Sequence, residues 1–384
     1  MNIVKVKFGV ERCPKKIGLP IGCDSCVLPV GYAGTEFIQS TEGSTICNYC
    51  TDHREPVFLG FDQLIKDLDL QSGEKVGVTV SGGKDSIWMW MKLVDILGSE
   101  KVTAFNHHKA GLVHPLAEEN VQKAKEILHT DLVMVSDEDM HTRFKKNLEV
   151  LLGNPDPAMI RVALCVGCRY GITGAMYAEG KKLGINKFMS AASYLELAPF
   201  KSCLMKMKGS GDEHLGLEVG LKESPEYSWS NENLIYIRRD DAHCYKTELS
   251  GRKSMSMYPN VHILDLDTYV PNIPSRNEEE VKERIGWRRP ARSWHFDCQI
   301  ESFKDVFYYG TLGYTETDFN LSAMVRHGLI SREEALKNIY SAREEIVNGK
   351  ENIFELMELL GVGKLKDKMN SFYEHSKFLS GQHR

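Results

Sequence analysis

Between residues 56 and about 270, short runs of apolar, often β-branched residues alternate with longer amphipathic stretches. The run at residues 75–80 is short, rich in valine and followed closely by a glycine pair, which is typical of a buried strand. By the same criteria the sequence predicts strands at residues 75–80, 102–105, 132–135 and 187–190, and helices at residues 85–97, 116–128 and 171–183. Strands separated by helices predict an α/β fold with a parallel sheet. Ligands of such sheets bind at the carboxyl ends of the strands.

The two ends of the chain follow other patterns. The first 55 residues contain too few apolar side chains to form a core of their own. From about residue 271 the pattern is mostly helical: Ser331–Glu334 fits a capping box at a helix start, and a second helix is expected over residues 351–360, ended by Gly361. The polar tail after about residue 371 is expected to fray. We therefore predict three parts, at residues 1–55, 56–270 (the α/β domain) and 271–384 (a helical C-terminal region).

The first predicted strand leads into the sequence SGGKDS and then directly into a helix. The two glycines let the backbone approach an anion closely, and the helix start supplies amide groups and the positive end of a dipole. The lysine can neutralise phosphate, the serines can donate hydroxyl groups, and the aspartate fits a magnesium ligand. The predicted phosphate-binding residues are Ser81, Gly82, Gly83, Lys84, Asp85 and Ser86, and the predicted catalytic residues among them are Lys84 and Asp85.

This loop lacks the GxxxxGK(S/T) pattern of kinase-type phosphate loops. It resembles the PP-loop of the ATP pyrophosphatases, and the resemblance covers the middle part of the chain. It implies an adenine nucleotide alpha hydrolase-like domain that uses ATP and Mg²⁺ to adenylate a carbonyl or amide oxygen, with release of pyrophosphate. A nitrogen or sulfur nucleophile then displaces AMP.

Two pairs of cysteines near the N-terminus have the spacing of a zinc ribbon. Cys23 and Cys26 form the first C-x-x-C pair, and Cys47 and Cys50 form the second, twenty residues further on. We predict that these four thiolates bind a structural Zn²⁺, because the segment is too poor in apolar residues to be stable without it. The alternative is four unligated thiols in a disordered arm.

A third pair, Cys165-x-x-Cys168, falls near the predicted helix that follows the third strand. Two thiolates at that edge of the sheet could be part of a metal site, a redox pair or a persulfide relay, or simply small buried side chains. Cys298 is the best candidate for a third ligand, and Cys203 and Cys244 are weaker ones. The arrangement resembles the iron–sulfur-dependent tRNA thiolases of the PP-loop superfamily, which implies a [4Fe-4S] cluster with one open iron.

The two ends of the chain resemble a different family. Cys23–Pro29 with Cys47–Cys50 looks like the opening of the N-acetyl sugar amidotransferases of surface polysaccharide (LPS) biosynthesis, and Leu321–Ala335 is similar to their closing helices. This resemblance implies that ATP activates the acetamido oxygen of a nucleotide sugar. Ammonia from a separate glutaminase partner then gives an acetamidino group.

The pair Cys165-x-x-Cys168 is not expected in that family, so the nucleophile stays open. With a sulfur-donor partner, the same adenylation would thiolate a tRNA or a small metabolite.

Charge and hydropathy indicate where in the cell the protein is expected to act. A net charge of −5 gives no general attraction to nucleic acid or to a membrane. The sequence shows neither a signal peptide nor an apolar stretch of about 18 residues, so we predict a cytoplasmic protein without a membrane span. In that compartment cysteine pairs indicate metal rather than disulfides. Trp287 either stacks on a ligand or packs between domains, and both a monomer and a homodimer remain open.

Overall fold

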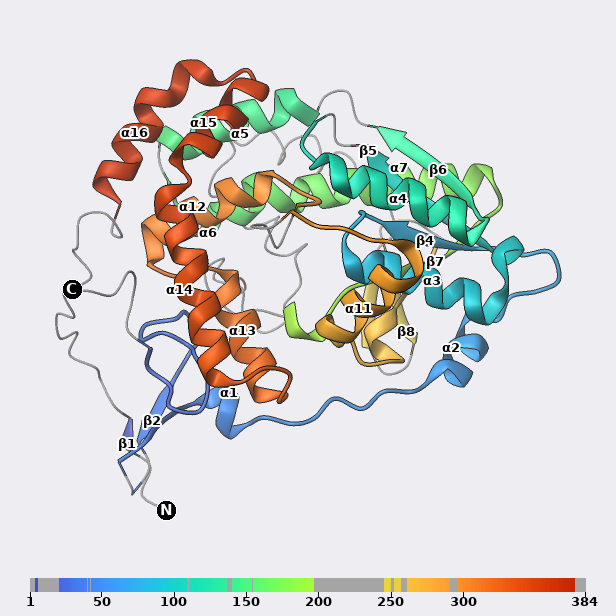
Figure 1. Ribbon diagram of the computed structural model, residues 1–384, viewed down its shortest axis with the longest axis horizontal. Coiled ribbons are helices and arrows are strands. Elements are labelled where there is room, and N and C mark those ends of the chain that lie inside the picture. The colour runs from blue at the N-terminus through green and yellow to red at the C-terminus, as the bar shows by residue number, and fades with distance from the viewer. Residues whose placement is uncertain are drawn as a thin grey trace.

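The protein is described by a computed structural model, which shows how the sheet and the helical region are arranged (Figure 1). The structure describes residues 4–5, 21–39, 41, 43–108, 111–136, 140–153, 155–196, 245–249, 252–256, 261–290 and 296–376.

The centre of the α/β part is a parallel sheet of five strands in the order β10-β7-β4-β5-β6. The strands are β4 (Val76–Val80), β5 (Val102–His108), β6 (Asp131–Ser136), β7 (Lys187–Ser190) and β10 (His262–Asp265). Every neighbouring pair is parallel. The predicted α/β fold and its four predicted strands are therefore confirmed, and β10 is an additional strand.

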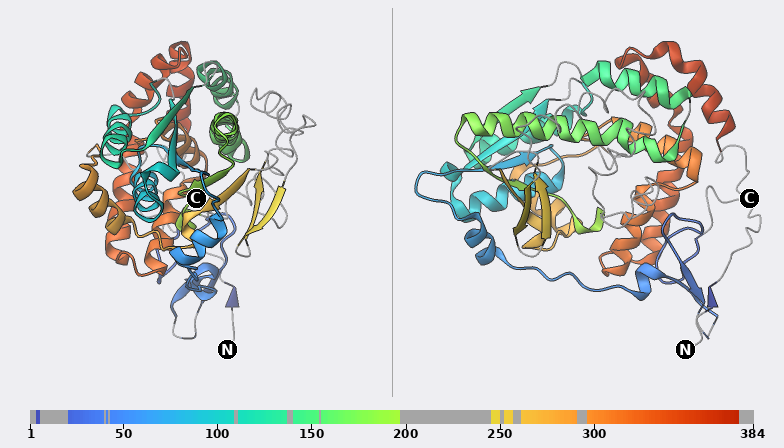
Figure 2. Two further views of the ribbon diagram at one scale, coloured as in Figure 1. Left: turned by 90° about the vertical axis from the view of Figure 1, so that its right-hand side faces the viewer. Right: turned by 180° about the vertical axis from the view of Figure 1, so that it is seen from behind.

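Helices cover both faces of this sheet. Since successive strand residues point to opposite sides, each strand contributes side chains to the packing on both faces. Val78 and Ala104 pack into a cluster with α2, α3, α4 and α11, whereas Phe105 and Phe188 pack with Met176 of α7 on the other face. Figure 2 shows α7 running along the sheet from behind. The helices are α2 (Phe61–Leu68), α3 (Lys84–Leu97), α4 (Pro115–Leu128), α7 (Gly167–Lys182) and α11 (Pro274–Ile285), with short turns η1 (Ser99–Lys101), η3 (Tyr194–Glu196) and η4 (Leu266–Thr268).

Two small antiparallel sheets lie outside this core. Near the N-terminus β1 (Val4–Lys5), β2 (Phe37–Gln39) and β3 (Thr45–Cys47) form one, followed by the short helix α1 (Asn48–Thr51). The strands β8 (Tyr245–Leu249) and β9 (Arg252–Ser256) form the other. An extended connection from α1 to α2 runs along the lower edge of the molecule in Figure 1.

The helical region forms a second, large hydrophobic cluster. Its members are α5 (Met140–Gly153), α6 (Pro157–Arg161), the π-helix η2 (Val162–Val166), α12 (Ile300–Leu312), α13 (Glu316–Arg326), α14 (Arg332–Asn348), α15 (Lys350–Leu359), η5 (Gly363–Leu365) and α16 (Lys366–His375). The predicted helical C-terminal region is confirmed. The expected fraying after residue 371 is wrong as far as His375, because Tyr373 of α16 is buried in this cluster.

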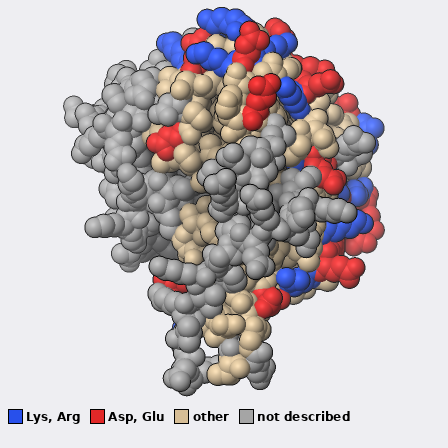
Figure 3. Space-filling model, turned by 90° about the vertical axis from the view of Figure 1, so that its left-hand side faces the viewer, with Lys and Arg blue, Asp and Glu red and all other residues tan. Residues whose placement is uncertain are grey.

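The buried clusters bring together segments that are far apart in the sequence. The N-terminal cysteines pack with α12–α16, although some 300 residues separate them, while α11 packs on α3 of the sheet. On the face shown in Figure 3, basic and acidic side chains of the described residues lie intermixed. Among the described residues, every helix is too short or too polar to cross a membrane.

Candidate active site and metal centre

The predicted phosphate loop lies where the strand order of the sheet changes direction. From β4 the chain continues through α3 to β5 on one side, whereas β7 pairs with β4 on the other side. Such a switch point opens a crevice at the carboxyl ends of the strands. A small pocket in this crevice is lined by Asp85 and Trp88 from α3, Ala191 and Ala192 after β7, and Leu266 and Asp267 after β10. The sequence SGGKDS therefore occupies the position where an α/β sheet binds ligands.

Gly82 fixes the path of the loop. Its φ of +90° is unfavourable for other residues, and a Cβ at this position would lie 2.2 Å from the carbonyl oxygen of Ala117 in α4. The Gly82 carbonyl accepts hydrogen bonds from Trp287 Nε1 (2.9 Å) and Asn120 Nδ2 (3.4 Å). Trp287 is thus a buried residue that supports the loop. Of the two predicted roles, the structure favours packing over stacking on a ligand.

Hydroxyl groups support the same loop from inside. Ser86 Oγ accepts a hydrogen bond from the Ser81 amide (3.2 Å) and donates one to the Gly83 carbonyl (3.0 Å). Ser81 Oγ accepts from the Gly83 amide (3.3 Å). Helix α3 begins directly after Gly83, so its first amide groups and its positive dipole end lie at the loop. The loop therefore has a defined shape without a ligand and offers an anion-binding helix start.

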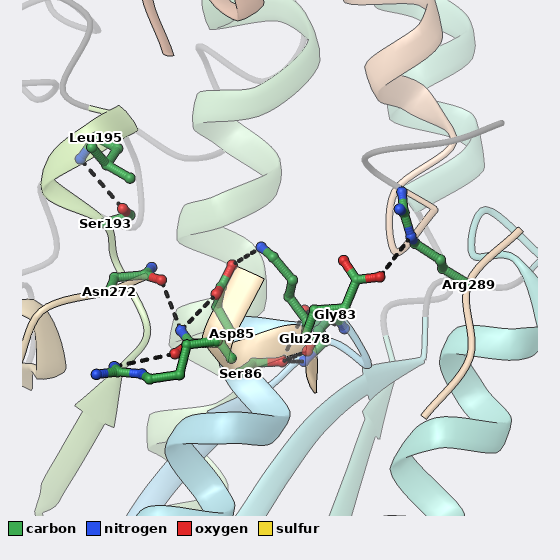
Figure 4. A network of polar contacts seen from close by, with 12 residues as sticks. Gly83, Asp85, Ser86, Ser193, Leu195, Asn272, Glu278 and Arg289 are labelled. Carbon is green, nitrogen blue, oxygen red and sulfur yellow. Dashed lines mark hydrogen bonds and ion pairs between the residues drawn. The ribbon is translucent and has the colours of Figure 1, made fainter. Parts of the chain in front are cut away.

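The charged residues of the loop form an ion pair, and Asp85 belongs to the network of polar contacts drawn in Figure 4. Lys84 Nζ lies 2.6 Å from Asp85 Oδ2, and the side chains are 20% and 26% exposed. The other oxygen, Asp85 Oδ1, accepts a hydrogen bond from Asn277 Nδ2 (3.2 Å), which also donates to Asn272 Oδ1 (2.8 Å). Helix α11 thus orients the carboxylate, a role that the sequence did not reveal.

Two further carboxylates lie beside this pair. Asp267 is buried in the wall of the pocket, and Asp297 Oδ2 lies 3.3 Å from the place where a Cβ on Gly83 would be. Carboxylate oxygens are the ligands that Mg²⁺ prefers next to phosphate groups. Asp85 and Asp297 are thus two carboxylates at the loop. The only sequence signal for Asp297 was its position next to Cys298.

The four N-terminal cysteines form a compact group. Cys23 Sγ lies 3.8 Å from Cys50 Sγ, Cys26 Sγ lies 3.7 Å from Cys47 Sγ, and all four sulfurs are within 4.8 Å of one another. Four sulfurs about 2.3 Å from one tetrahedral ion are about 3.8 Å apart. The residues therefore fit a single metal ion, whereas an iron–sulfur cluster holds its thiolates on separate irons and further apart.

Electrostatics at this group also favour a cation. Hydrogen bonds with the Cys26, Cys47 and Cys50 thiols hold the pKa of Cys23 well below its usual range. The same contact with Cys23 raises the pKa of Cys47 and of Cys50. Without a cation, ionisation of Cys23 thus opposes ionisation of Cys47 and Cys50. A bound cation stabilises all four thiolates at once and so removes this opposition. Amide groups of Cys26 and Cys47 also donate to Cys23 Sγ (3.4 and 3.3 Å).

The metal-binding segment is fixed to the C-terminal helices. Arg332, at the start of α14, donates from Nε to the Cys26 carbonyl (3.0 Å) and from Nη2 to the Cys23 carbonyl (3.3 Å). The amide of Ala33 donates to the hydroxyl of Tyr314 (3.0 Å). The segment with Cys23 and Cys26 and the start of α14 thus pack against each other.

The third cysteine pair is only partly described. Cys165 lies in the π-helix η2, partly buried, and Cys298 precedes α12; both pack against the helical cluster. Burial raises the pKa of the Cys165 thiol to about 12, against the effect of the Lys304 ammonium in α12. Cys168 is described for its backbone alone, and Cys203 and Cys244 lie outside the described residues. The structure thus brings Cys165 to the helix that follows Cys298, while a ligand role for Cys165, Cys168 and Cys298 stays a prediction.

Comparisons with known proteins add little to this geometry. No protein-family model and no curated protein matches the sequence. Similar solved structures include the U34-tRNA thiolase NcsA from Methanococcus maripaludis with its [4Fe-4S] cluster, at 13% identity over 88% of this chain and 89% of that chain (TM-score 0.33). Others are a glutamine-dependent NAD⁺ synthetase from Acinetobacter baumannii in complex with ADP (13%, 58% and 48%, TM-score 0.28) and NMN synthetase from Francisella tularensis (13%, 63% and 92%, TM-score 0.25). At such low TM-scores the fold rests on the strand order and the loop themselves.

Proposed function

We propose that this protein is an enzyme that binds MgATP at Ser81–Ser86 and splits it into AMP and pyrophosphate. The observation that carries the proposal is the position of this loop at the switch point of the parallel sheet, with Lys84 and Asp85 beside the pocket. The helix start and Lys84 bind the phosphates, and Asp85 with Asp297 holds Mg²⁺. Magnesium, when bound, neutralises the charge that develops on the leaving pyrophosphate.

In the proposed reaction, a carbonyl or amide oxygen of an acceptor attacks the α-phosphorus of ATP. The bond from that phosphorus to the bridging oxygen breaks, and pyrophosphate leaves with the electron pair. Lys84 favours this step because its ammonium group opposes the negative charge on the phosphates. Asn277 keeps the Asp85 carboxylate in place, since it donates to the oxygen that does not contact Lys84.

The acceptor that we propose is the acetamido group of an N-acetylated nucleotide sugar. Its oxygen is adenylated, ammonia adds to the activated carbon, and AMP leaves with the former amide oxygen, which gives an acetamidino group. The proposal is supported by the resemblance of both chain ends to the sugar amidotransferases and by the contacts of Arg332 with Cys23 and Cys26 between those ends. A glutaminase partner would supply the ammonia, and the four-cysteine group would hold structural Zn²⁺.

Sulfur transfer is the second candidate. It is favoured by one observation, that Cys165 and the segment after Cys298 meet in the same cluster, near the charged side chains of α12. With Cys168 these cysteines would hold a [4Fe-4S] cluster. Sulfide from a sulfur-donor partner, in place of ammonia, would then add to the activated carbon of a tRNA or metabolite, and AMP would leave.

The two candidates predict different products from the same activated intermediate. Anaerobically purified protein would be incubated with MgATP, ¹⁵N-ammonium and a panel of N-acetylated nucleotide sugars, and the products analysed by mass spectrometry. We expect ¹⁵N in an acetamidino sugar, formed by the wild type and by Cys165→Ala but not by Asp85→Asn. In a parallel incubation with tRNA and a sulfide donor in place of the sugars and the ammonium, a product that contains sulfur and disappears in Cys165→Ala would establish the second candidate instead.

A further inference from the structure

A second group of metal-ligating side chains lies away from the four cysteines. His53 Nε2 is 3.0 Å from Glu55 Oε1, and His327 Nδ1 is 3.2 Å from Glu55 Oε2. The donor atoms of these three residues all lie within 4.8 Å of one another. The two imidazole rings meet edge to face, with centroids 4.6 Å apart. The ligand atoms of two imidazoles and one carboxylate therefore lie close enough together to hold one ion.

The donor set and its spacing fit a divalent transition ion. Nitrogen and oxygen ligands about 2.1 Å from one ion lie about 3.0 Å apart at octahedral angles and about 3.4 Å apart at tetrahedral angles. The contacts of His53 with Oε1 of Glu55 (3.0 Å) and of His327 with Oε2 of Glu55 (3.2 Å) fall in this range. Two histidines with one carboxylate also form the ligand set of zinc sites that keep a coordination position open.

The exposure of the three side chains indicates an exchangeable rather than a closed site. Glu55 is 72% exposed, whereas His53 and His327 are 23% and 12% exposed. The two imidazoles thus lie on the protein side of the site, and the carboxylate lies on its solvent side. Three protein ligands leave room for water or for an oxygen atom of another molecule. This differs from the four-cysteine group, whose ligands already complete a tetrahedron.

Distant segments of the chain build this cluster near the pocket of the active site. His53 and Glu55 belong to the extended connection after α1, and His327 ends α13. Tyr194 in η3 stacks edge to face on His327, with ring centroids 4.9 Å apart. Burial raises the pKa of Tyr194, and the carboxylates of Glu55 and of Asp267 in the pocket wall raise it further. Tyr194 also follows Ala192, which lines the pocket, by two positions, so this short segment joins the cluster to the pocket.

We propose that His53, Glu55 and His327 form a binding site for one divalent transition-metal ion of the zinc class, with a coordination position open to an oxygen ligand. The proposal rests on these three side chains alone and does not depend on the reaction at the phosphate loop. The other use of such a triad is a hydrogen-bond chain in which Glu55 joins two imidazoles. Metal binding distinguishes the two.

Untagged protein that carries zinc in its four-cysteine group would be titrated with Co²⁺ while visible absorption and bound metal are measured. We expect one additional Co²⁺ per chain, with a spectrum that lacks sulfur-to-cobalt charge transfer because the ligands are nitrogen and oxygen. Glu55→Gln and His327→Ala should each weaken this binding by about tenfold or more. His53→Ala, on the exposed connection, should do the same without affecting folding.

Two controls make the result specific. His375→Ala removes a histidine of α16, outside the cluster, and should leave cobalt binding unchanged. Asp85→Asn should also leave it unchanged, which separates this site from the proposed magnesium ligands. Absence of an additional cobalt ion, or equal binding by the wild type, Glu55→Gln and His53→Ala, would overturn the proposal and would leave the ATP reaction untouched.

Discussion

The phosphate loop should not tolerate a side chain at Gly82. In Gly82→Ala, a residue with a side chain would have to hold φ near +90°, which costs about 1–2 kcal/mol. The new Cβ would also lie 2.2 Å from the carbonyl oxygen of Ala117, so the backbone has to move. Overpacking of this kind costs about 1–3 kcal/mol. We expect a total loss of about 2–5 kcal/mol in the free energy of unfolding.

Gly184 offers a matched control. It has a φ of +73°, but a Cβ there would have no heavy atom within 4 Å. Gly184→Ala therefore carries the conformational cost without the clash, and the effect of alanine on the unfolded chain is similar in both variants. Urea unfolding should show Gly82→Ala to be less stable than Gly184→Ala by about 1–3 kcal/mol.

Nucleotide binding should separate the same two variants. The Gly82 carbonyl is held by Trp287 and Asn120, so a shift of this residue displaces the whole loop. Calorimetric titration with MgATP should show binding by the wild type and by Gly184→Ala and loss of binding by Gly82→Ala. If Gly82→Ala matched Gly184→Ala in stability and bound MgATP like the wild type, the close packing of the loop and its role in binding would both be refuted.

Three further substitutions test the role of Asp85, the zinc site and a buried ion pair. Asp85→Asn should reduce pyrophosphate release about a hundredfold or more. The free energy of unfolding should change by less than about 1 kcal/mol, because the Lys84–Asp85 ion pair is partly exposed. Release at the wild-type rate would contradict a role for the carboxylate. Cys47→Ser should remove about one zinc ion per chain, the ion of the four-cysteine group, and lower the melting temperature. Cys298→Ser should retain this zinc, as metal analysis and calorimetry will show. Arg343→Met should cost about 3–5 kcal/mol in urea unfolding, because it leaves the buried Asp318 carboxylate, 2.6 Å from Arg343 Nη2, without that partner. A loss below about 1 kcal/mol would mean that Asp318 does not depend on this ion pair.

Local patterns predicted the elements that depend on their own residues. The valine-rich run before Ser81 predicted β4, and the spacing of Cys23, Cys26, Cys47 and Cys50 predicted the compact thiolate group, because a strand and a C-x-x-C turn are specified within a few residues.

The strand β10 was missed because His262–Asp265 contains only two apolar residues, and its pairing with β7 decides its conformation.

Residues that act across long distances in the chain could not be predicted in the same way. Asn120, Asn277 and Trp287 support the loop from α4, α11 and the segment after α11, and their own surroundings in the sequence contain no phosphate-binding pattern. The contact between Glu55 and His327 spans 272 residues. All these contacts depend on how distant segments pack together, which no local pattern specifies.

The proposed reaction cleaves ATP between its α- and β-phosphates at Ser81–Ser86. The most direct measurement is chromatographic separation of the nucleotides formed from MgATP in the presence of ammonium and N-acetylated nucleotide sugars, with Asp85→Asn as the comparison. We expect AMP and pyrophosphate in equal amounts from the wild type and neither from Asp85→Asn. ADP and phosphate as the products, or AMP formation that is unchanged in Asp85→Asn, would contradict it.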